Sequence, residues 1–89
     1  MKVILRTSRF KRDVKRMQRQ GKKIEKLKAL LAILVNEEPL APSYRDHVLV
    51  GQYKSSRECH IEPDWLLIYE STEDEIIFIR AGSHSALFR

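Results

Sequence analysis

The residues best suited to chemistry are three histidines and one carboxylate in the second half of the chain. His47, His60 and His84 are the only histidines, and Asp64 follows His60 by four residues. Histidine both accepts and releases a proton near neutral pH. Cleavage of RNA without a metal ion needs a base for the 2′-hydroxyl proton, a cation for the phosphorane and an acid for the departing 5′-oxygen. The set therefore indicates acid–base catalysis on a phosphodiester.

Two arginines and an aromatic side chain complete the candidate site. We expect Arg57 and Arg80 near the phosphate, because a guanidinium offers a rigid fork of donors that matches phosphate oxygens. His84 follows a strand-like apolar run and a Gly-Ser turn, so a strand end positions it. Phe88 then either stacks on a base of the substrate or fills the edge of the core.

Purely structural roles and a metal site are the alternatives. His47 can cap a turn. The neighbours of His60 do not decide to which face of the sheet its side chain points. Asp64 can have a purely structural role in the turn at Pro63. Zinc sites usually show close pairs of ligands, whereas these histidines are 13 and 24 positions apart. The sequence therefore predicts no metal site and no cofactor.

Positive charge is concentrated at the start of the chain. Residues 1–35 contain twelve basic and two acidic side chains, whereas residues 36–89 contain five basic and ten acidic ones. This asymmetry indicates a polyanionic partner on the N-terminal side, with a solvated helix face as the alternative. Lys11, Lys15 and Arg19 are the side chains of the first predicted helix that we expect to contact RNA.

Length and composition predict one soluble domain over residues 1–89. The chain is 43% hydrophobic and 33% charged, which is typical of a globular protein. No apolar run approaches the ~20 residues that cross a bilayer, and the apolar part of the start is too short for a signal peptide. A single cysteine, Cys59, excludes an internal disulfide and fits a reducing compartment. We therefore expect a cytoplasmic protein without a membrane partner.

The apolar pattern predicts an α+β fold. A short first strand at 3–5 precedes a helix with Phe10, Val14 and Met17 on one stripe, and a second, more apolar and better buried helix ends before Pro39. Beyond a loop over 37–46 the pattern becomes extended. Strands are expected at 47–54 with a bend at the glycine, at 57–61, at 65–69 and at 76–80. This order predicts two helices packed on one face of an antiparallel β-sheet meander.

Four stretches of the chain resemble YafQ-type toxins of the RelE/ParE superfamily. They read Leu40-Ala41-Pro42-x-Tyr44-x-Asp46-His47-x-Leu49, Gly51-x-Tyr53-Lys54, Arg57-Glu58-Cys59-His60-Ile61-Glu62-Pro63-Asp64-Trp65-Leu66-Leu67-Ile68-Tyr69 and Arg80-x-Gly82-Ser83-His84-Ser85-x-Leu87-Phe88. With Phe10-x-x-Asp13-Val14-Lys15 in the first helix, the resemblance spans nearly the whole chain.

The resemblance implies a RelE-like fold and the toxin of a type II toxin–antitoxin pair. Such a toxin enters the A site of the 70S ribosome and cleaves messenger RNA there, by attack of the 2′-hydroxyl and without a metal ion. The catalytic positions of the family fall on His47, His60, Asp64 and His84, and its terminal aromatic residue falls on Phe88. We expect His84 as the general acid, Asp64 with His47 or His60 as the base, and Arg80 near the phosphate.

The implied partners are a ribosome, messenger RNA and a cognate antitoxin. The antitoxin is expected to be an acidic chain with a ribbon-helix-helix DNA-binding part and a tail that wraps the toxin. Two other functions remain open. The same superfamily contains ParE-like gyrase inhibitors with this fold, and an RNA-binding module with structural histidines would share the charge pattern.

Overall fold

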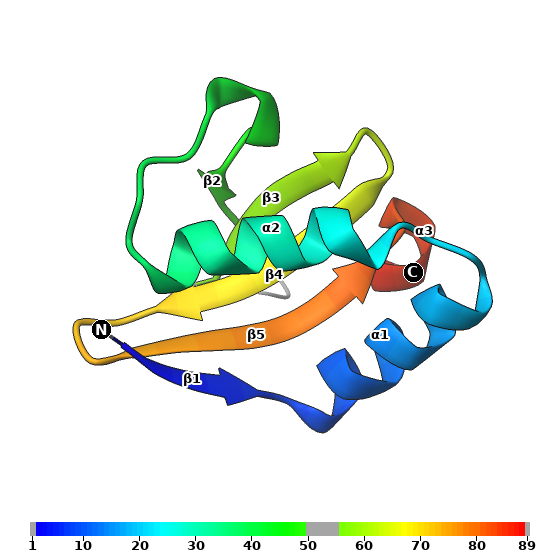
Figure 1. The fold of residues 1–89 in the computed structure, drawn as a ribbon, viewed down its shortest axis with the longest axis horizontal. Coiled ribbons are helices and arrows are strands. Elements are labelled where there is room, and N and C mark those ends of the chain that lie inside the picture. Colours follow the sequence, from blue (N-terminus) through cyan, green and yellow to red (C-terminus); the bar gives the residue numbers. More distant parts are fainter. Residues whose placement is uncertain (1, 50–55, 89) are drawn as a thin grey trace.

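The structure is a computed structural model that describes residues 2–49 and 56–88 (Figure 1). Three helices and a short 3-10 helix accompany a five-stranded sheet, which confirms the α+β fold. In chain order the elements are β1 (Val3–Arg6), α1 (Ser8–Arg19), α2 (Ile24–Val35), η1 (Pro42–Tyr44), β2 (His47–Val48), β3 (Arg57–Glu62), β4 (Trp65–Ser71), β5 (Glu75–Gly82) and α3 (His84–Leu87). No helix in the described ranges has both the length and the apolarity to cross a membrane.

The sheet has the strand order β1-β5-β4-β3-β2. Strands β2 to β5 form the expected antiparallel meander, whereas β1 pairs in parallel with β5. The two helices carry the chain from the β1 edge to the β2 edge, and the meander then returns it to β1 (Figure 1). The strand expected over 47–54 is confirmed at His47–Val48, and positions 50–54 lie outside the described residues.

Thr7 caps the start of helix α1. The Thr7 hydroxyl accepts a hydrogen bond from the Phe10 amide at 3.0 Å and donates to the Ile79 carbonyl at 2.7 Å, so the cap also fastens the helix to β5. Gly21, with φ of 78°, follows the end of the helix in the left-handed region that favours glycine.

The second helix is the better buried one over its length, as expected: five of its twelve residues are exposed, against eight of twelve in the first. For fully buried side chains the order is reversed. Helix α1 buries Phe10, Asp13 and Met17, whereas α2 fully buries only Leu27 and Leu30. One stripe of α2 faces the sheet, so the apolar side chains around the rest of the helix stay partly exposed.

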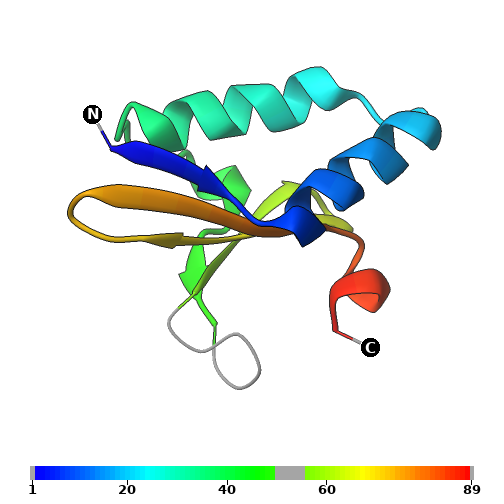
Figure 2. The same ribbon diagram turned by 90° about the horizontal axis from the view of Figure 1, so that it is seen from below.

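The two faces of the sheet have different environments. Trp65, Leu67 and Tyr69 belong to the main core with α1 and α2, while Leu66 and Ile68 pack on the other face with Leu87 of α3. Figure 2 shows α3 on the opposite side of the sheet from α1 and α2. Sequence analysis did not predict α3, a single turn capped by the Ser83 hydroxyl, which accepts from the Ala86 amide at 3.2 Å. We call the side that carries α3 the open face.

Candidate active site

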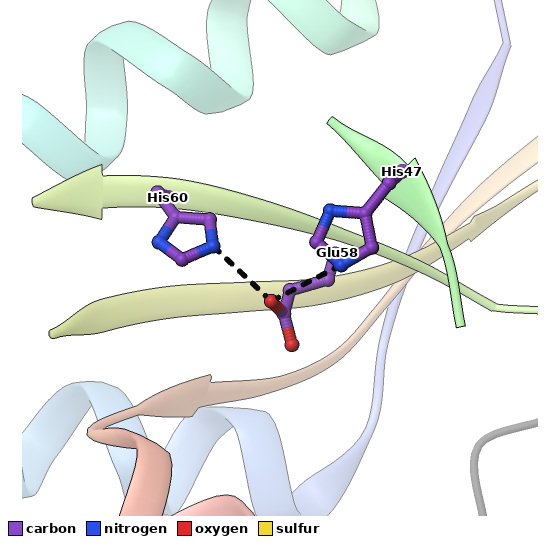
Figure 3. Close-up of side chains that lie close together, drawn as sticks. All are labelled: His47, Glu58 and His60. Carbon is purple, nitrogen blue, oxygen red and sulfur yellow. Dashed lines mark ion pairs between the residues drawn. The ribbon is translucent and has the colours of Figure 1, made fainter. Parts of the chain in front are cut away.

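A buried carboxylate lies between two of the three histidines. Strand pairing places His47 directly opposite Glu58, and Glu58 shares a face with His60 two residues later. One oxygen of Glu58, Oε1, is 3.4 Å from His47 Nε2 and 3.2 Å from His60 Nε2 (Figure 3). Glu58 is not among the site residues expected from the sequence, although the period of two along a strand pairs it with His60.

The three side chains of this group differ in burial, and the carboxylate is the most buried. The Glu58 side chain is 5% exposed, that of His60 is 15% exposed and that of His47 is 49% exposed. An ionised carboxylate is costly to bury without partners, so a proton or a cation shared with the imidazoles stabilises it. His47 Nδ1 lies 2.7 Å from the Arg45 carbonyl. Because a carbonyl only accepts, Nδ1 carries the hydrogen and Nε2 faces Glu58.

Asp64 contacts the start of α3 and not the histidine pair. Its Oδ1 accepts a hydrogen bond from the His84 backbone N–H at 2.9 Å, so it holds the first residue of α3. The structure places Glu58, and not Asp64, in contact with His47 and His60. Sequence spacing favoured Asp64 because it lies close to His60 along the chain, but the β3–β4 turn points it towards α3.

The third histidine lies on the same face as the other two. Leu66 and Ile68 of β4 stand directly opposite His60 and Glu58 in β3, and residues opposite each other share a face. Leu66 and Ile68 pack with Leu87 of α3. The histidine pair of β2 and β3 and the helix that carries His84 therefore flank a common apolar floor, with β3 and β5 two strand spacings apart, roughly 9–10 Å.

Phe88 stacks beside His84. Their ring centroids are 4.9 Å apart with an interplanar angle of 40°, and Phe88 also packs against the cluster of Leu66, Ile68 and Leu87. The structure thus shows the packing role of Phe88 at the edge of the core, and its stacking on a base of the substrate stays a prediction.

Arg57 lies on the wrong face for contact with this site. It pairs with Tyr69 on the side of the sheet that packs against α1 and α2. Its Nη2 and Nε donate to Asp46 Oδ2 at 2.8 and 3.1 Å, and the Tyr69 hydroxyl donates to Asp46 Oδ1 at 2.7 Å. Burial raises the pKa of Asp46, but these hydrogen bonds outweigh it and the pKa is lowered. The prediction that Arg57 binds phosphate is corrected, because strand alternation turns its side chain away from the histidines.

Arg80 is anchored by a buried carboxylate of α1. Its Nε and Nη2 donate to the two oxygens of Asp13 at 2.9 and 3.0 Å. Arg16 and the Ala81 amide also donate to Asp13, at 2.8 and 3.1 Å. Burial raises the pKa of Asp13, but hydrogen bonds from Arg80, Ala81 and Arg16 lower it further than burial raises it. Asp13 therefore fixes the arginine just before the turn into α3.

The basic side chains of α1 lie on the other side of the sheet. Lys11, Lys15 and Arg19 are all exposed. Lys11 and Lys15 also border a groove of about 360 Å³ between α1 and α2. Its lining residues are Arg6, Phe10, Lys11, Val14, Lys15, Gln18, Ile24, Leu27, Lys28 and Leu31. The groove combines an apolar floor with a basic rim.

Comparison with known proteins identifies the family. The family described as "Bacterial toxin of type II toxin-antitoxin system, YafQ" matches residues 2–89. The chain belongs to the YafQ family. The mRNA interferase toxin YafQ of Escherichia coli (strain K12) is 43% identical over 83 residues, which cover 92% of this chain and 90% of the relative.

Solved structures of YafQ-family toxins agree with the fold. The toxin in the crystal structure of the E. coli DinJ-YafQ complex matches with a TM-score of 0.94 and 41% identity, over 100% of both chains. A crystal structure of metal-bound toxin from Helicobacter pylori matches with a TM-score of 0.91 and 40% identity, over 99% of this chain and 100% of the other. The RelE-like fold expected from the sequence is confirmed.

Proposed function

We propose that this YafQ-family toxin is an endoribonuclease that cleaves messenger RNA on the ribosome and so inhibits translation. The observation that supports this most directly is the open face, where Glu58 contacts two imidazoles and His84 lies across an apolar floor. A relative that is 43% identical carries the name mRNA interferase toxin. A gyrase inhibitor or a simple RNA-binding module would have no use for proton-transfer groups on both sides of one floor.

The proposed reaction is an internal transesterification. The 2′-oxygen forms a bond to phosphorus while the bond from phosphorus to the 5′-oxygen breaks. The 2′-hydroxyl proton passes to the base, and the acid delivers a proton to the departing 5′-oxygen. The products are a 2′,3′-cyclic phosphate and a 5′-hydroxyl, so no water, metal ion or other reactant is consumed. Each positioned proton-transfer group supplies roughly 10²–10⁴-fold in rate.

The geometry favours one division of roles. His84 is the proposed general acid, held at the start of α3 by the bond from its amide to Asp64. The base is the group of Glu58 with His47 and His60, in which the carboxylate contacts both rings. Asp64 becomes a positioning residue, which revises the expectation that it acts as the base. Arg80, oriented by Asp13, is the proposed cation near the phosphate, and Phe88 stacks on a base.

The basic surface of α1 is the proposed contact with ribosomal RNA in the A site. Lys11, Lys15 and Arg19 are exposed on the side of the sheet away from the histidines. A toxin that binds by this surface would keep its open face available for messenger RNA. Such contacts act through counterion release, so the affinity falls as salt increases. With this proposed function, we expect the chain to act in the cytoplasm.

A cognate acidic antitoxin is the second proposed partner. The groove between α1 and α2 has an apolar floor that includes Phe10 and Leu27, and lysines on its rim. An amphipathic segment with acidic side chains fits such a groove. We expect this segment to form the tail of an antitoxin whose DNA-binding part is a ribbon-helix-helix domain.

Mapping of new messenger RNA ends tests the proposal. The chain is induced in growing bacteria beside a His84→Ala variant, and 5′ ends are sequenced. New ends in register with the reading frame, absent from the variant, are expected. Growth arrest with intact messenger RNA would refute the ribonuclease and favour a gyrase-type inhibitor.

A further inference from the structure

We infer that His47, Glu58 and His60 also form a binding site for a divalent transition-metal ion such as Zn²⁺, and that the bound ion switches the nuclease off. The second half of this inference rests on the proposed function, whereas metal binding does not. The sequence argument against a metal site relied on spacing along the chain. The pairing of β2 with β3 overcomes that spacing, because it brings His47 opposite Glu58.

The distances fit the edges of a coordination tetrahedron. One nitrogen or oxygen of each side chain lies within 4.8 Å of the others. Zinc bonds to imidazole nitrogen and carboxylate oxygen are about 2.0–2.2 Å long, which gives tetrahedral edges of roughly 3.3–3.5 Å. Glu58 Oε1 already lies 3.4 Å from His47 Nε2 and 3.2 Å from His60 Nε2. Two of the three edges therefore need almost no adjustment, and the half-exposed His47 ring is able to close the third.

The hydrogen bonding of His47 prepares its Nε2 for a metal ion. Nδ1 donates to the Arg45 carbonyl at 2.7 Å, so in the neutral ring Nε2 carries a lone pair. Histidines that bind metals usually donate their other nitrogen in this way, which fixes the ring. A lone pair that faces an ionised carboxylate is repelled unless a proton or a cation lies between them. A metal ion satisfies this requirement for both rings at once.

His60 differs from His47 at its second nitrogen. Its Nδ1 is buried and has no hydrogen-bond partner among the described residues, so its ring lacks the donor contact that fixes His47. The support for His60 as a ligand is the 3.2 Å distance from its Nε2 to Glu58 Oε1.

The ligand set determines which ions fit and what they do. Two imidazoles and one carboxylate suit Zn²⁺, Cu²⁺ or Ni²⁺ better than Mg²⁺ or Ca²⁺, which prefer oxygen ligands. Three protein ligands leave a fourth position for water. The ion would occupy the nitrogen and oxygen lone pairs of the proposed base, so the 2′-hydroxyl proton would have no acceptor there. Cleavage would stop while the fold is unchanged.

Metal binding is tested on the full-length, metal-free chain. Zn²⁺ titration by calorimetry, and the visible absorption of tetrahedral Co²⁺, are compared for wild type, Glu58→Gln, His60→Gln and His84→Gln. We expect one ion per chain for wild type and His84→Gln, and affinity weakened ~10-fold or more for the other two. Circular dichroism and thermal unfolding establish that each variant is folded. Unchanged affinity in folded Glu58→Gln and His60→Gln would overturn the site.

The switch is tested separately on the cleavage reaction with programmed ribosomes. Metal-free wild type should cleave in the presence of EDTA, saturating Zn²⁺ should reduce the rate at least ~10-fold, and excess EDTA should restore it. Full activity with the site saturated would overturn the switch, as would activity that requires Zn²⁺. Absence of cleavage by metal-free wild type would refute the proposed function, and the switch with it, but would leave the binding result intact.

Discussion

The backbone N–H of His84 donates to Asp64 Oδ1 at 2.9 Å, so the turn between β3 and β4 holds the first residue of α3. The contact joins two segments that are 20 residues apart in the chain. It aligns the proposed acid with the face that carries the proposed base. In the proposed mechanism Asp64 acts through the position of His84, a role that is separable from proton transfer.

Substitution of Asp64 separates the two roles. Asp64→Asn keeps an oxygen that accepts from His84, so we expect it to retain most of the cleavage rate. Asp64→Ala loses that acceptor, and a displaced catalytic group should lower kcat between about 10- and 100-fold with little change in KM. Single-turnover cleavage on programmed ribosomes measures both. If Asn is as damaging as Ala, Asp64 exchanges protons and the positioning role is wrong.

Glu58→Gln should abolish most of the activity and leave the fold intact. The amide has nearly the same shape but cannot accept the proton, and the expected loss is roughly 10²–10⁴-fold in kcat. Glu62→Gln is the matched control on the same strand, because Glu62 pairs with Lys26 at the surface, at 2.7 Å. Equal activity of folded Glu58→Gln and Glu62→Gln would remove Glu58 from the mechanism.

Asp13 should make the free energy of unfolding depend on pH. Its pKa is below the ordinary value of 3.8 in the folded chain, so the ionised form favours folding. The stabilisation is fully present above pH 3.8 and is lost as the pH falls through the lower folded pKa. Asp13→Asn should unfold more easily at neutral pH, by on the order of 3 kcal/mol, and show a weaker acid transition. Urea unfolding from pH 2 to 7 measures this, and parallel pH curves for both chains would contradict it.

Charge reversal on α1 distinguishes its two proposed partners. The triple variant with Lys11, Lys15 and Arg19 changed to Glu should bind ribosomes more weakly and with a shallower dependence on salt. Arg19 does not line the groove between α1 and α2, whereas Lys11 and Lys15 do. Arg19→Glu alone should therefore weaken ribosome binding and spare the antitoxin complex. Ribosome pelleting measures binding to the ribosome, and titration with the antitoxin measures binding to the antitoxin. Unchanged ribosome binding by the triple variant would show that the basic side chains of α1 are only solvated.

The sequence predicted the elements of the fold well because periodicity and capping are local signals. Phe10, Val14 and Met17 predicted α1 through their common stripe. The parallel pairing of β1 with β5 depends on contacts between residues about 70 positions apart, which no local pattern reports. The short helix α3 is too brief for a periodic signal.

The candidate site was predicted in its residue types more than in its geometry. The chemical types of the three histidines were predicted, and the structure adds that Phe88 flanks His84. Glu58 was missed because a carboxylate inside a strand gives no sign of its neighbours until the register is known. Arg57 was included because its charge suits phosphate, but alternation along β3 directs it to Asp46.

Cleavage of a messenger RNA whose scissile 5′-oxygen is replaced by sulfur tests the role of His84 as general acid directly. A thiolate leaves without a proton, so the reaction no longer needs a general acid. If His84 is the general acid, this substrate restores the rate of His84→Ala nearly to that of wild type and leaves Glu58→Gln defective. A His84→Ala variant that stays defective on the sulfur substrate would contradict the assignment of His84 as the acid.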